Sequence, residues 1–561
     1  MFHKPHIMSH FPFLNILTVI LFMLFHAATS QNSTNLEAEA LLKWKNTLDS
    51  QSQMLLSSWE SDNPCNSWLG ISCNMEGSII RINLTNADLG GTLKGFDFAS
   101  FRHLTSLDLH RNSLTGYIPL PITNMSNLAL LNLGYNQFSG YIPPQMGTMA
   151  GLEVLSLSYN LLSGKIPAEL GNLTNLSVLI LSANHLSGGI PPELGKLRLL
   201  TELRLNLNNL SGPVPSSIGD MLGLKILSLY GNQLSGLLPI EINKLTNLTL
   251  FYLSNNSISG PLPENICQGR ILADFCASNN RFTGTIPKWV KNCTSLTRLR
   301  VDRNFLVGNI SEDFGVYPVL DYIDLSYNNF RGEVSPNWGK CRIMTSLKIS
   351  NNNITGEIPP EISEAGNLHV LDLSSNKLHG NVPSELSKLK SLFNLTLSNN
   401  NLSGAIPSGL GLLPELAYLD LASNWLNGSI PSQLGQCLKM MYLNLSRNSL
   451  QGDVPEEIGR LVSLQVGLDL SRNLLSGTIP SELGNLVMLE VLDLSHNRLN
   501  GTIPSTLDQM LSLRQVDVSY NDLEGPIPDN RAFEEAPPEA LVHNRGLCGN
   551  RTGLLLPCAA L

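Results

Sequence analysis

Charge and aromatic rings are scarce in this sequence of 561 residues. Charged residues make up 14% of it and aromatic residues 6%, and the formal net charge is −9. Without a basic excess there is no electrostatic basis for binding nucleic acid or an anionic membrane surface. The length exceeds what one ordinary globular core fills, so the chain holds several domains or an array of repeats.

Catalytic motifs are also missing. The sequence contains no HExxH, no GxSxG, no P-loop and no convergent set of His, Asp and Ser residues. It likewise lacks the Gly-rich loop, HRD and DFG motifs of a protein kinase. We therefore expect no enzymatic activity, no cofactor and no catalytic metal ion.

Long apolar runs are confined to the N-terminus. Residues 11–25 are almost entirely apolar, and Ala28 and Ser30 are small residues at the positions that a signal peptidase requires. The run is shorter than the ~20 residues of a membrane-spanning helix, which favours a cleaved signal peptide over an uncleaved anchor. We expect a secreted protein with no transmembrane segment in this chain.

One eight-residue pattern dominates the rest of the sequence. It is LDLHRNSL at residues 107–114, and its asparagine returns every 24 residues from Asn112 to Asn521, with one extra residue between Asn448 and Asn473. With a degenerate copy that has Ala87 in the asparagine slot, there are nineteen copies. The leading leucines, two residues apart, point to one side of a short strand, and each copy buries them only against its neighbours. The pattern predicts an α/β repeat solenoid, a right-handed superhelix with a parallel sheet on its concave face.

Both ends of such an array need a cap. Residues 36–60 carry leucines and tryptophans at roughly helical spacing, and cysteine pairs stand near each end. We expect disulfides between Cys65 and Cys73 and between Cys548 and Cys558, since a metal site would need four-ligand clusters that the sequence lacks there. The expected divisions are a signal peptide at 1–30, an N-terminal cap at 31–78, repeats at 79–530 and a C-terminal cap at 531–561.

The remaining cysteines lie inside the array. Cys267 and Cys293 are about one repeat apart and are expected to form a third disulfide. Cys341 and Cys437 are four repeats apart, which is ~19 Å at ~4.8 Å per stacked strand and beyond the reach of a disulfide. We expect these two and Cys276 to be free thiols.

Several segments closely resemble the extracellular part of plant leucine-rich-repeat receptor-like kinases and receptor-like proteins. They are EAEALLKWK at 37–45, the Trp68-x-Gly70 motif, the LxGxIP turns, and GPIPDN at 525–530 with LCG at 547–549. The details are most similar to kinases that sense small secreted peptides, including serine-rich immune peptides. The resemblance implies a secreted peptide or protein ligand and a co-receptor kinase ectodomain, in plant signalling or immunity. Because the kinase half is absent, both an apoplastic protein and a fragment of a cell-surface receptor remain open.

Ligand contacts are expected on the strand face that points away from the core. There, the residues four and two before each asparagine are usually Asp and Ser, and the chain keeps close to this pattern from Asp372 to Ser519. The middle repeats depart from it and introduce the arginine and tyrosine anchors typical of binding hot spots; the alternative is sequence drift. The predicted groove residues are Arg204, Asn206, Tyr230, Tyr252, Arg298, Arg300 and Asp302.

Arg298 and Arg300 flank a core leucine. The resemblance implies that such an Arg-x-Arg holds the terminal carboxylate of a peptide, which suits the guanidinium fork. Two alternatives remain: Arg298 lies at the sheet edge, or Asp302 pairs with one of the arginines. The resemblance also places a co-receptor contact near Arg472, His496 and Tyr520.

Asn-x-Ser/Thr sequons are abundant. Asn83 and Asn444 fall on the strand face, where a glycan would block docking. Most of the others are expected on the flanks or the convex side. The predicted glycosylation sites are Asn124, Asn172, Asn247, Asn292, Asn353, Asn394 and Asn500.

A second function stays open: a secreted inhibitor of microbial cell-wall hydrolases, as in the polygalacturonase inhibitors. Those proteins share the 24-residue repeat but are much shorter. The missing membrane segment favours the inhibitor. The length of the array, the cap sequence and the C-terminal cysteine pair favour the receptor.

Overall fold

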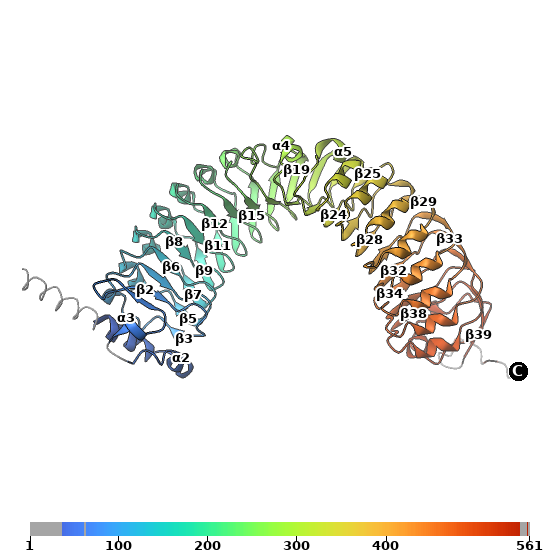
Figure 1. Ribbon diagram of the computed structural model, residues 1–561, viewed down its shortest axis with the longest axis horizontal. Coiled ribbons are helices and arrows are strands. Elements are labelled where there is room, and N and C mark those ends of the chain that lie inside the picture. The colour runs from blue at the N-terminus through green and yellow to red at the C-terminus, as the bar shows by residue number, and fades with distance from the viewer. Residues whose placement is uncertain (1–35, 61–62, 550–557, 559–561) are drawn as a thin grey trace, which may run out of the picture. The chain divides into compact units, whose positions relative to one another are not determined.

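The computed structural model describes residues 36–60, 63–549 and 558, so the expected signal peptide lies outside the described residues. The chain forms two compact units, the first ending at Leu248 and the second beginning at Thr249. Both are built from one repeat, which contains a three-residue sheet strand, a tight turn, a second short strand and usually one 3-10 turn (Figure 1).

The sheet strands follow the predicted 24-residue period. Nineteen of them lie in the described part of the chain, one for each copy of the pattern. In the first unit they are β2 (Ile79–Asn83), β4 (Ser106–Asp108), β6 (Leu130–Asn132), β8 (Val154–Ser156), β10 (Val178–Ile180), β12 (Glu202–Arg204) and β14 (Ile226–Ser228). In the second they are β16 (Leu250–Tyr252), β18 (Asp274–Cys276), β20 (Arg298–Arg300), β22 (Tyr322–Asp324), β24 (Ser346–Lys348), β26 (Val370–Asp372), β28 (Asn394–Thr396), β30 (Tyr418–Asp420), β32 (Tyr442–Asn444), β34 (Gly467–Asp469), β36 (Val491–Asp493) and β38 (Gln515–Asp517).

A second ladder of short strands follows the turns. In the first unit it contains β3 (Gly90–Thr92), β5 (Ser113–Tyr117), β7 (Gln137–Tyr141), β9 (Leu161–Lys165), β11 (His185–Gly188), β13 (Asn209–Gly212) and β15 (Gln233–Leu237). In the second unit it contains β17 (Ser257–Gly260), β19 (Arg281–Thr285), β21 (Phe305–Asn309), β23 (Asn329–Glu333), β25 (Asn353–Thr355), β27 (His379–Asn381), β29 (Asn401–Ala405), β31 (Trp425–Gly428), β33 (Ser449–Asp453), β35 (Leu474–Ser476), β37 (Asn500–Thr502), β39 (Asp522–Pro526) and β40 (Gly546–Cys548).

The 3-10 turns close each repeat on the side away from the sheet. In the first unit they are η1 (Phe98–Ser100), η2 (Leu120–Asn124), η3 (Pro144–Thr148), η4 (Ala168–Asn172), η5 (Pro192–Lys196), η6 (Ser216–Asp220) and η7 (Ile240–Lys244). In the second unit they are η8 (Pro336–Lys340), η9 (Pro360–Glu364), η10 (Ser384–Lys388), η11 (Ser408–Leu412), η12 (Ser432–Gln436), η13 (Glu456–Arg460), η14 (Ser481–Asn485), η15 (Ser505–Gln509) and η16 (Pro538–Ala540).

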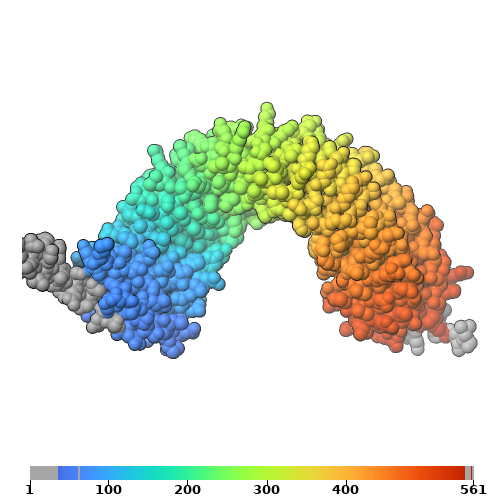
Figure 2. Space-filling model, viewed as in Figure 1, coloured from blue at the N-terminus to red at the C-terminus, as the bar shows by residue number. Residues whose placement is uncertain are grey.

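Neighbouring sheet strands run parallel, in a register set by the repeat. In the second unit Leu299 pairs with Ile323, which in turn pairs with Leu347. These side chains are essentially inaccessible to solvent and form the core. In this unit the sheet lies on the inner side of a curve, and the space-filling view shows that side as hollowed (Figures 1 and 2).

The repeated asparagine links one repeat to the previous one through hydrogen bonds. The buried Asn304 is typical: its Nδ2 donates to the carbonyl oxygens of Val301, at 3.0 Å, and Ala277, at 3.0 Å. Its Oδ1 accepts the backbone N–H of Phe282 at 2.9 Å. The side chain thus satisfies backbone groups of its own repeat and of the previous one, and it shares the two carbonyl oxygens with Asn328 and Asn280 of the neighbouring repeats.

The residue before each asparagine has a left-handed backbone. Its φ is close to +55° in almost every repeat, including +53° at Tyr135, +55° at Ala183 and +54° at Tyr520. This conformation turns the chain sharply at the end of the strand, and its cost in a non-glycine residue is tolerated because the asparagine bonds fix the turn.

The N-terminal cap is helical at residues 36–45 and at α2 (Ser50–Leu55), followed by α3 (Pro64–Ser67). Trp59 stacks on Trp68 with ring centroids 5.2 Å apart, and Trp44 lies 6.3 Å from Trp59. Leu55, one of the leucines at roughly helical spacing that were expected to cover the end of the core, is instead exposed. Cys65 and Cys73 form a disulfide, and β1 (Ile71–Cys73) pairs antiparallel with β2, which closes this end of the sheet.

At the C-terminal end the chain forms α6 (Arg531–Glu534), and Cys548 is bonded to Cys558. Residues 540–548 follow the geometry of one more repeat, which the sequence pattern did not reveal. Asn544 donates to the carbonyl oxygens of Val518 and Leu541 as the repeat asparagines do, and His543 has the left-handed φ of +58°. The cap is therefore built on the template of the repeat.

None of the helices in the described ranges has the length and hydrophobicity of a membrane span.

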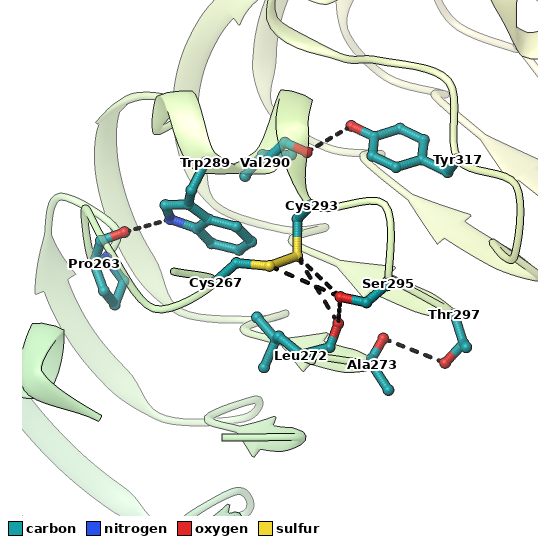
Figure 3. Close-up of a disulfide and its surroundings, with 10 residues drawn as sticks. All are labelled: Pro263, Cys267, Leu272, Ala273, Trp289, Val290, Cys293, Ser295, Thr297 and Tyr317. Carbon is teal, nitrogen blue, oxygen red and sulfur yellow. Dashed lines mark hydrogen bonds between the residues drawn. A yellow bond between two sulfur atoms is a disulfide. The ribbon is translucent and has the colours of Figure 1, made fainter. Parts of the chain in front are cut away.

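The third disulfide, between Cys267 and Cys293, lies at the start of the second unit (Figure 3). Here bends and turns replace the usual 3-10 turn, and α4 (Lys288–Asn292) and α5 (Ile310–Asp313) replace the next two. The indole N–H of Trp289 donates to the Pro263 carbonyl at 2.7 Å, and the Tyr317 hydroxyl donates to the Val290 carbonyl at 3.0 Å (Figure 3). This irregular segment is thus held by covalent and polar bonds. The other three cysteines, Cys276, Cys341 and Cys437, are free and buried.

The N-terminal cap contains a buried carboxyl group, Glu37, which predicts a pH-dependent stability. Only 2% of Glu37 is exposed, and its Oε2 accepts the N–H of Ile79 at 2.8 Å. Burial raises its pKa from 4.5 to about 7, against the effect of that hydrogen bond. A carboxyl group with a raised pKa in the folded state stabilises the fold fully below pH 4.5, and this contribution is lost as the pH rises through about 7.

We expect the cap to be less stable at pH 8 than at pH 5 by on the order of 1–3 kcal/mol. Urea unfolding followed by the fluorescence of the cap tryptophans measures this difference. Glu37→Gln should remove most of it, whereas Glu39→Gln, at an exposed position, should leave it intact. An unchanged pH dependence in Glu37→Gln would contradict the assignment.

Candidate functional site

Four rows of side chains cross the sheet face of each unit. Relative to the repeat asparagine, they are the leading row (six residues before), the inner row (four before), the second row (two before) and the outer row (one before). Because the strands are in register, each row places equivalent residues of successive repeats side by side. In the second unit, Cys276, Arg300, Asp324 and Lys348 are consecutive members of the inner row.

Arg300 is paired within its own repeat. Its Nη2 lies 3.2 Å from Oδ1 of Asp302, and its Nε donates to the same oxygen at 3.3 Å. Asp302 is only 6% exposed and also accepts a hydrogen bond from the Ser278 hydroxyl. This pairing was one of the alternatives left open by the sequence, and it places a fixed negative charge beside the Arg300 guanidinium.

Three cations surround the ring of Tyr322. The Arg298 guanidinium carbon lies 5.1 Å from the ring centroid, the Lys348 Nζ 5.6 Å and the Arg300 guanidinium carbon 5.8 Å. These distances are typical of cation–π contacts. Among the described residues, no carboxylate lies within ion-pair distance of Arg298 or Lys348. Two cations therefore share one aromatic ring without an ion pair of their own, although Lys348 interacts electrostatically with Asp324 on the paired strand.

The neighbouring Tyr252 is fixed as a hydrogen-bond donor. Its hydroxyl donates to Oδ2 of Asp274 at 2.8 Å. Burial, and then the bond to Asp274, raises the pKa of Tyr252 well above its usual value, so the phenol stays neutral. Burial likewise raises the pKa of the Cys276 thiol, next in the inner row, to about 12. Neither the Tyr252 phenol nor the Cys276 thiol is therefore ionised at neutral pH.

A hollow of about 400 Å³ lies along the other side of Arg300. The Arg303 guanidinium at its edge stacks on Tyr327, 4.2 Å from the ring centroid. Asn255 at the rim, which begins a sequon, accepts a hydrogen bond from Asn279 at 2.9 Å. The hollow is lined by Ser254, Asn255, Ser278, Asn279, Arg300, Asp302 and Arg303.

The other predicted groove residues belong to the first unit. Arg204 forms an ion pair with Glu202 in the same strand, and the buried Asn206 accepts the Ser228 hydroxyl at 2.9 Å. Tyr230 is half-buried. Arg204 and Asn206 thus already have partners within the first unit.

The residues predicted to contact a co-receptor form part of an aromatic column in the outer row. Tyr520 is stacked between His496 and His543, with ring centroids 4.2 Å away on each side. Desolvation, and then Arg472, lowers the pKa of His496. His543 was missed because it belongs to the C-terminal cap, although it stands one residue before an asparagine, as His496 does.

The predicted glycosylation sites occupy different environments. Asn124, Asn172 and Asn292 end η2, η4 and α4, while Asn353 and Asn500 begin β25 and β37 and are exposed. The Asn247 amide donates to the Leu222 carbonyl at 2.9 Å. Asn394 differs from the expected flank position: it lies in β28, half-buried, and accepts the Thr396 hydroxyl at 2.8 Å. A glycan there would stand on the sheet.

Sequence reasoning missed Tyr322 and Lys348. Lys348 replaces the usual aspartate of the inner row, and this departure from the pattern could have identified it from the sequence alone. Tyr322 belongs to the leading row, which was not considered as part of the face. Only the structure shows that these residues and Arg298, from three consecutive strands, converge on one ring.

Comparisons with known protein families match the N-terminal cap and many of the repeats. Residues 34–74 match the leucine rich repeat N-terminal domain, and residues 342–402 together with nine segments between 103 and 510 match leucine rich repeats. A probable leucine-rich repeat receptor-like protein kinase of Arabidopsis thaliana is 43% identical over 115 residues, 19% of this chain and 10% of that protein. MDIS1-interacting receptor like kinase 2, from the same plant, is 42% identical over 104 residues, 18% of this chain. The matched stretches span 10% of each relative's length.

Solved structures match over far more of the chain. The Arabidopsis receptor kinase HAESA, in complex with the peptide hormone IDA and the co-receptor SERK1, is 30% identical with a TM-score of 0.72, over 93% of this chain and 99% of that one. The PEPR1–AtPEP1 complex is 30% identical with a TM-score of 0.71, over 92% of this chain and 83% of that one. The fold predicted from the sequence, a leucine-rich-repeat solenoid, is confirmed.

Proposed function

Since this chain belongs to the leucine-rich-repeat family of plant receptor-kinase ectodomains, we propose that it binds a secreted peptide and holds an anionic group of that peptide between Arg298 and Lys348, over Tyr322. The observation that carries the proposal is the pair of cations on one ring, neither of them in an ion pair with a carboxylate of the described residues. A peptide carboxylate supplies the missing charge and suits the fork of Arg298.

The proposal divides the roles of the two arginines. Arg300 donates to Asp302 through its Nε and, to both carboxylate oxygens, through its Nη2, and the buried carboxylate repels an incoming anion. Arg298 is exposed, lies against Tyr322, and forms no ion pair with a carboxylate of the described residues. We therefore assign the carboxylate contact to Arg298 with Lys348, and give Arg300 the role of positioning Asp302 and Tyr322.

We also propose that a co-receptor ectodomain contacts the column of His496, Tyr520 and His543 together with Arg472. The HAESA complex, which contains a co-receptor, supports a partner of this class. Aromatic side chains held rigid by stacking lose little conformational entropy on binding, which makes them good interface anchors. The signalling role of the whole receptor follows from the relatives and is part of the proposal.

The test begins with a screen of synthetic secreted peptides against the purified protein. For a peptide that binds, we expect Arg298→Ala to weaken affinity about tenfold, the usual loss for one charge-assisted contact at a partly exposed site. Amidating the peptide's C-terminus should weaken binding to the parent similarly and should add little to the Arg298→Ala loss. Isothermal titration calorimetry measures the affinity of both proteins, parent and Arg298→Ala, for both peptides, acid and amide, which completes a double-mutant cycle.

Controls separate this contact from general charge. Arg331→Ala removes an exposed arginine of the second ladder and should leave affinity unchanged, while Arg298→Lys should restore part of the loss. Equal binding of acid and amide peptides to the parent would overturn the carboxylate contact. If no peptide binds and a microbial wall hydrolase does, the inhibitor function replaces the receptor.

A further inference from the structure

The outer row of the first unit contains an aromatic column that ends abruptly. Tyr135 and Tyr159, from consecutive repeats, stack with ring centroids 4.0 Å apart and planes inclined by 19°. His110 packs edge-on against Tyr135 at 5.0 Å. Both tyrosines remain substantially exposed, at 43% and 44%. The next residue in the row is Ala183, so the row supplies no ring directly after Tyr159.

The position above Ala183 is not filled by its other neighbour. Leu207, one repeat further along, leans the other way: its Cδ2 lies 2.8 Å from where a Cβ of Gly231 would be. Leu207 thus covers Gly231 in the following repeat, where the absence of a side chain provides room for it. Because the Ala183 side chain ends at Cβ, the row has room for a further group between Tyr159 and the 41%-exposed Leu207, and we call this position the slot.

The second-row residues beside this slot, Ser158, Ser182 and Asn206, are uncharged. Arg204 is paired with Glu202, and Arg111 and Tyr230 interact electrostatically with Tyr135 in the column. Successive strands are ~4.8 Å apart, so a flat ring placed above Ala183 would continue the column at normal stacking distance. The slot therefore suits an uncharged planar group and disfavours a charged one.

We infer that the slot above Ala183 is a subsite for an aromatic side chain of the ligand, which stacks on Tyr159 as the next ring of the column. The inference rests on the proposed function for the presence of a peptide ligand. It adds a specificity element that the carboxylate contact does not provide: the ligand carries an aromatic residue. A sugar ring, which also stacks on tyrosine, is the competing occupant.

The test uses small probes rather than a peptide. N-acetyl-L-tryptophanamide, N-acetyl-L-leucinamide and cellotetraose are titrated against the folded chain by saturation-transfer NMR. We expect the tryptophan amide to bind with millimolar affinity and the leucine amide several-fold more weakly. Tyr159→Leu removes the ring face and should weaken the tryptophan amide about two- to tenfold.

Ala183→Tyr provides the sharper variant, because it fills the slot with a ring of the protein itself. Tyrosine is tolerated at this left-handed position, since Tyr135, Tyr159, Tyr327 and Tyr520 all occupy it with φ between +52° and +56°. This variant should lose the tryptophan amide. Ala183→Ser should retain it, because serine is small and already occupies the same left-handed position at Ser375.

Two results would overturn the subsite: undiminished binding of the tryptophan amide to Ala183→Tyr, or binding of cellotetraose with none of the amide. The probes are uncharged and bear no carboxylate, so their binding does not depend on Arg298. A negative result with the probes would therefore not contradict the proposed carboxylate contact. A negative result with Arg298→Ala and the amidated peptide would not contradict the aromatic subsite.

Discussion

Replacing Asn304 with alanine is expected to destabilise the middle of the second unit by about 2–6 kcal/mol. The side chain is buried and satisfies the N–H of Phe282 and the carbonyl oxygens of Ala277 and Val301. Alanine leaves the buried Phe282 N–H without its acceptor. It also removes one of the two amide bonds to each carbonyl oxygen, since Asn280 still donates to Ala277 and Asn328 to Val301. Each lost bond of the second kind costs about 0.5–1.5 kcal/mol. Each orphaned buried group costs about 1–3 kcal/mol, and the lost amide also leaves a small cavity.

Hydrogen exchange read by mass spectrometry measures this effect locally, which matters because long repeat arrays do not unfold in one step. Exchange should accelerate in β18, β20 and β22. The matched control is Asn337→Ala, which removes only an exposed hydrogen bond from Lys340 and should cost under about 0.5 kcal/mol. Equal protection in the two variants would show that the asparagine ladder does not hold the repeats together.

The repeat could be predicted from the sequence because its signals are local and redundant. The leucine spacing, the asparagine and the glycine each recur every 24 residues, so one ambiguous copy is corrected by its neighbours. The cysteine pairs in the structure are those expected from their positions near the array ends and one repeat apart. The C-terminal turn at Asn544 was missed because it lacks the leucine strand that normally precedes the asparagine.

The binding face was less predictable because it depends on where long side chains go. The sequence located Arg298 and Arg300 but did not determine that Asp302 pairs with Arg300. That choice depends on side-chain conformation and on Ser278 one repeat earlier. Tyr322, at the centre of the cluster, lies in a row whose members elsewhere include Val370 and Val491, so its position alone gave no functional signal.

Replacing Gly339 with alanine is expected to disrupt the outer side of the array near the proposed carboxylate site. A Cβ on Gly339 would lie 1.9 Å from the carbonyl oxygen of Glu361 in the next 3-10 turn. Backbone cannot move aside as a flexible side chain does, so η8 and η9 must separate. Overpacking of this kind costs about 3 kcal/mol or somewhat more.

The consequence should reach the sheet face, because η8 and η9 close the repeats that carry Tyr322 and Lys348. Strand pairing holds β22 and β24 at a fixed spacing, so pushing the turns apart either increases the local bend or breaks the contacts between turns. We expect faster hydrogen exchange in residues 336–340 and 360–364, and weaker binding of any peptide that depends on Arg298 and Lys348.

Gly366→Ala is the matched control, since a Cβ there meets nothing within 4 Å and the substitution should be neutral or slightly stabilising. Because Gly339 touches no proposed ligand atom, a binding loss in Gly339→Ala together with unchanged binding in Gly366→Ala would show that the outer turns set the spacing of the cation pair. Unchanged exchange and unchanged binding in Gly339→Ala would mean that the turns yield without strain, and that strand pairing alone positions Tyr322 and Lys348.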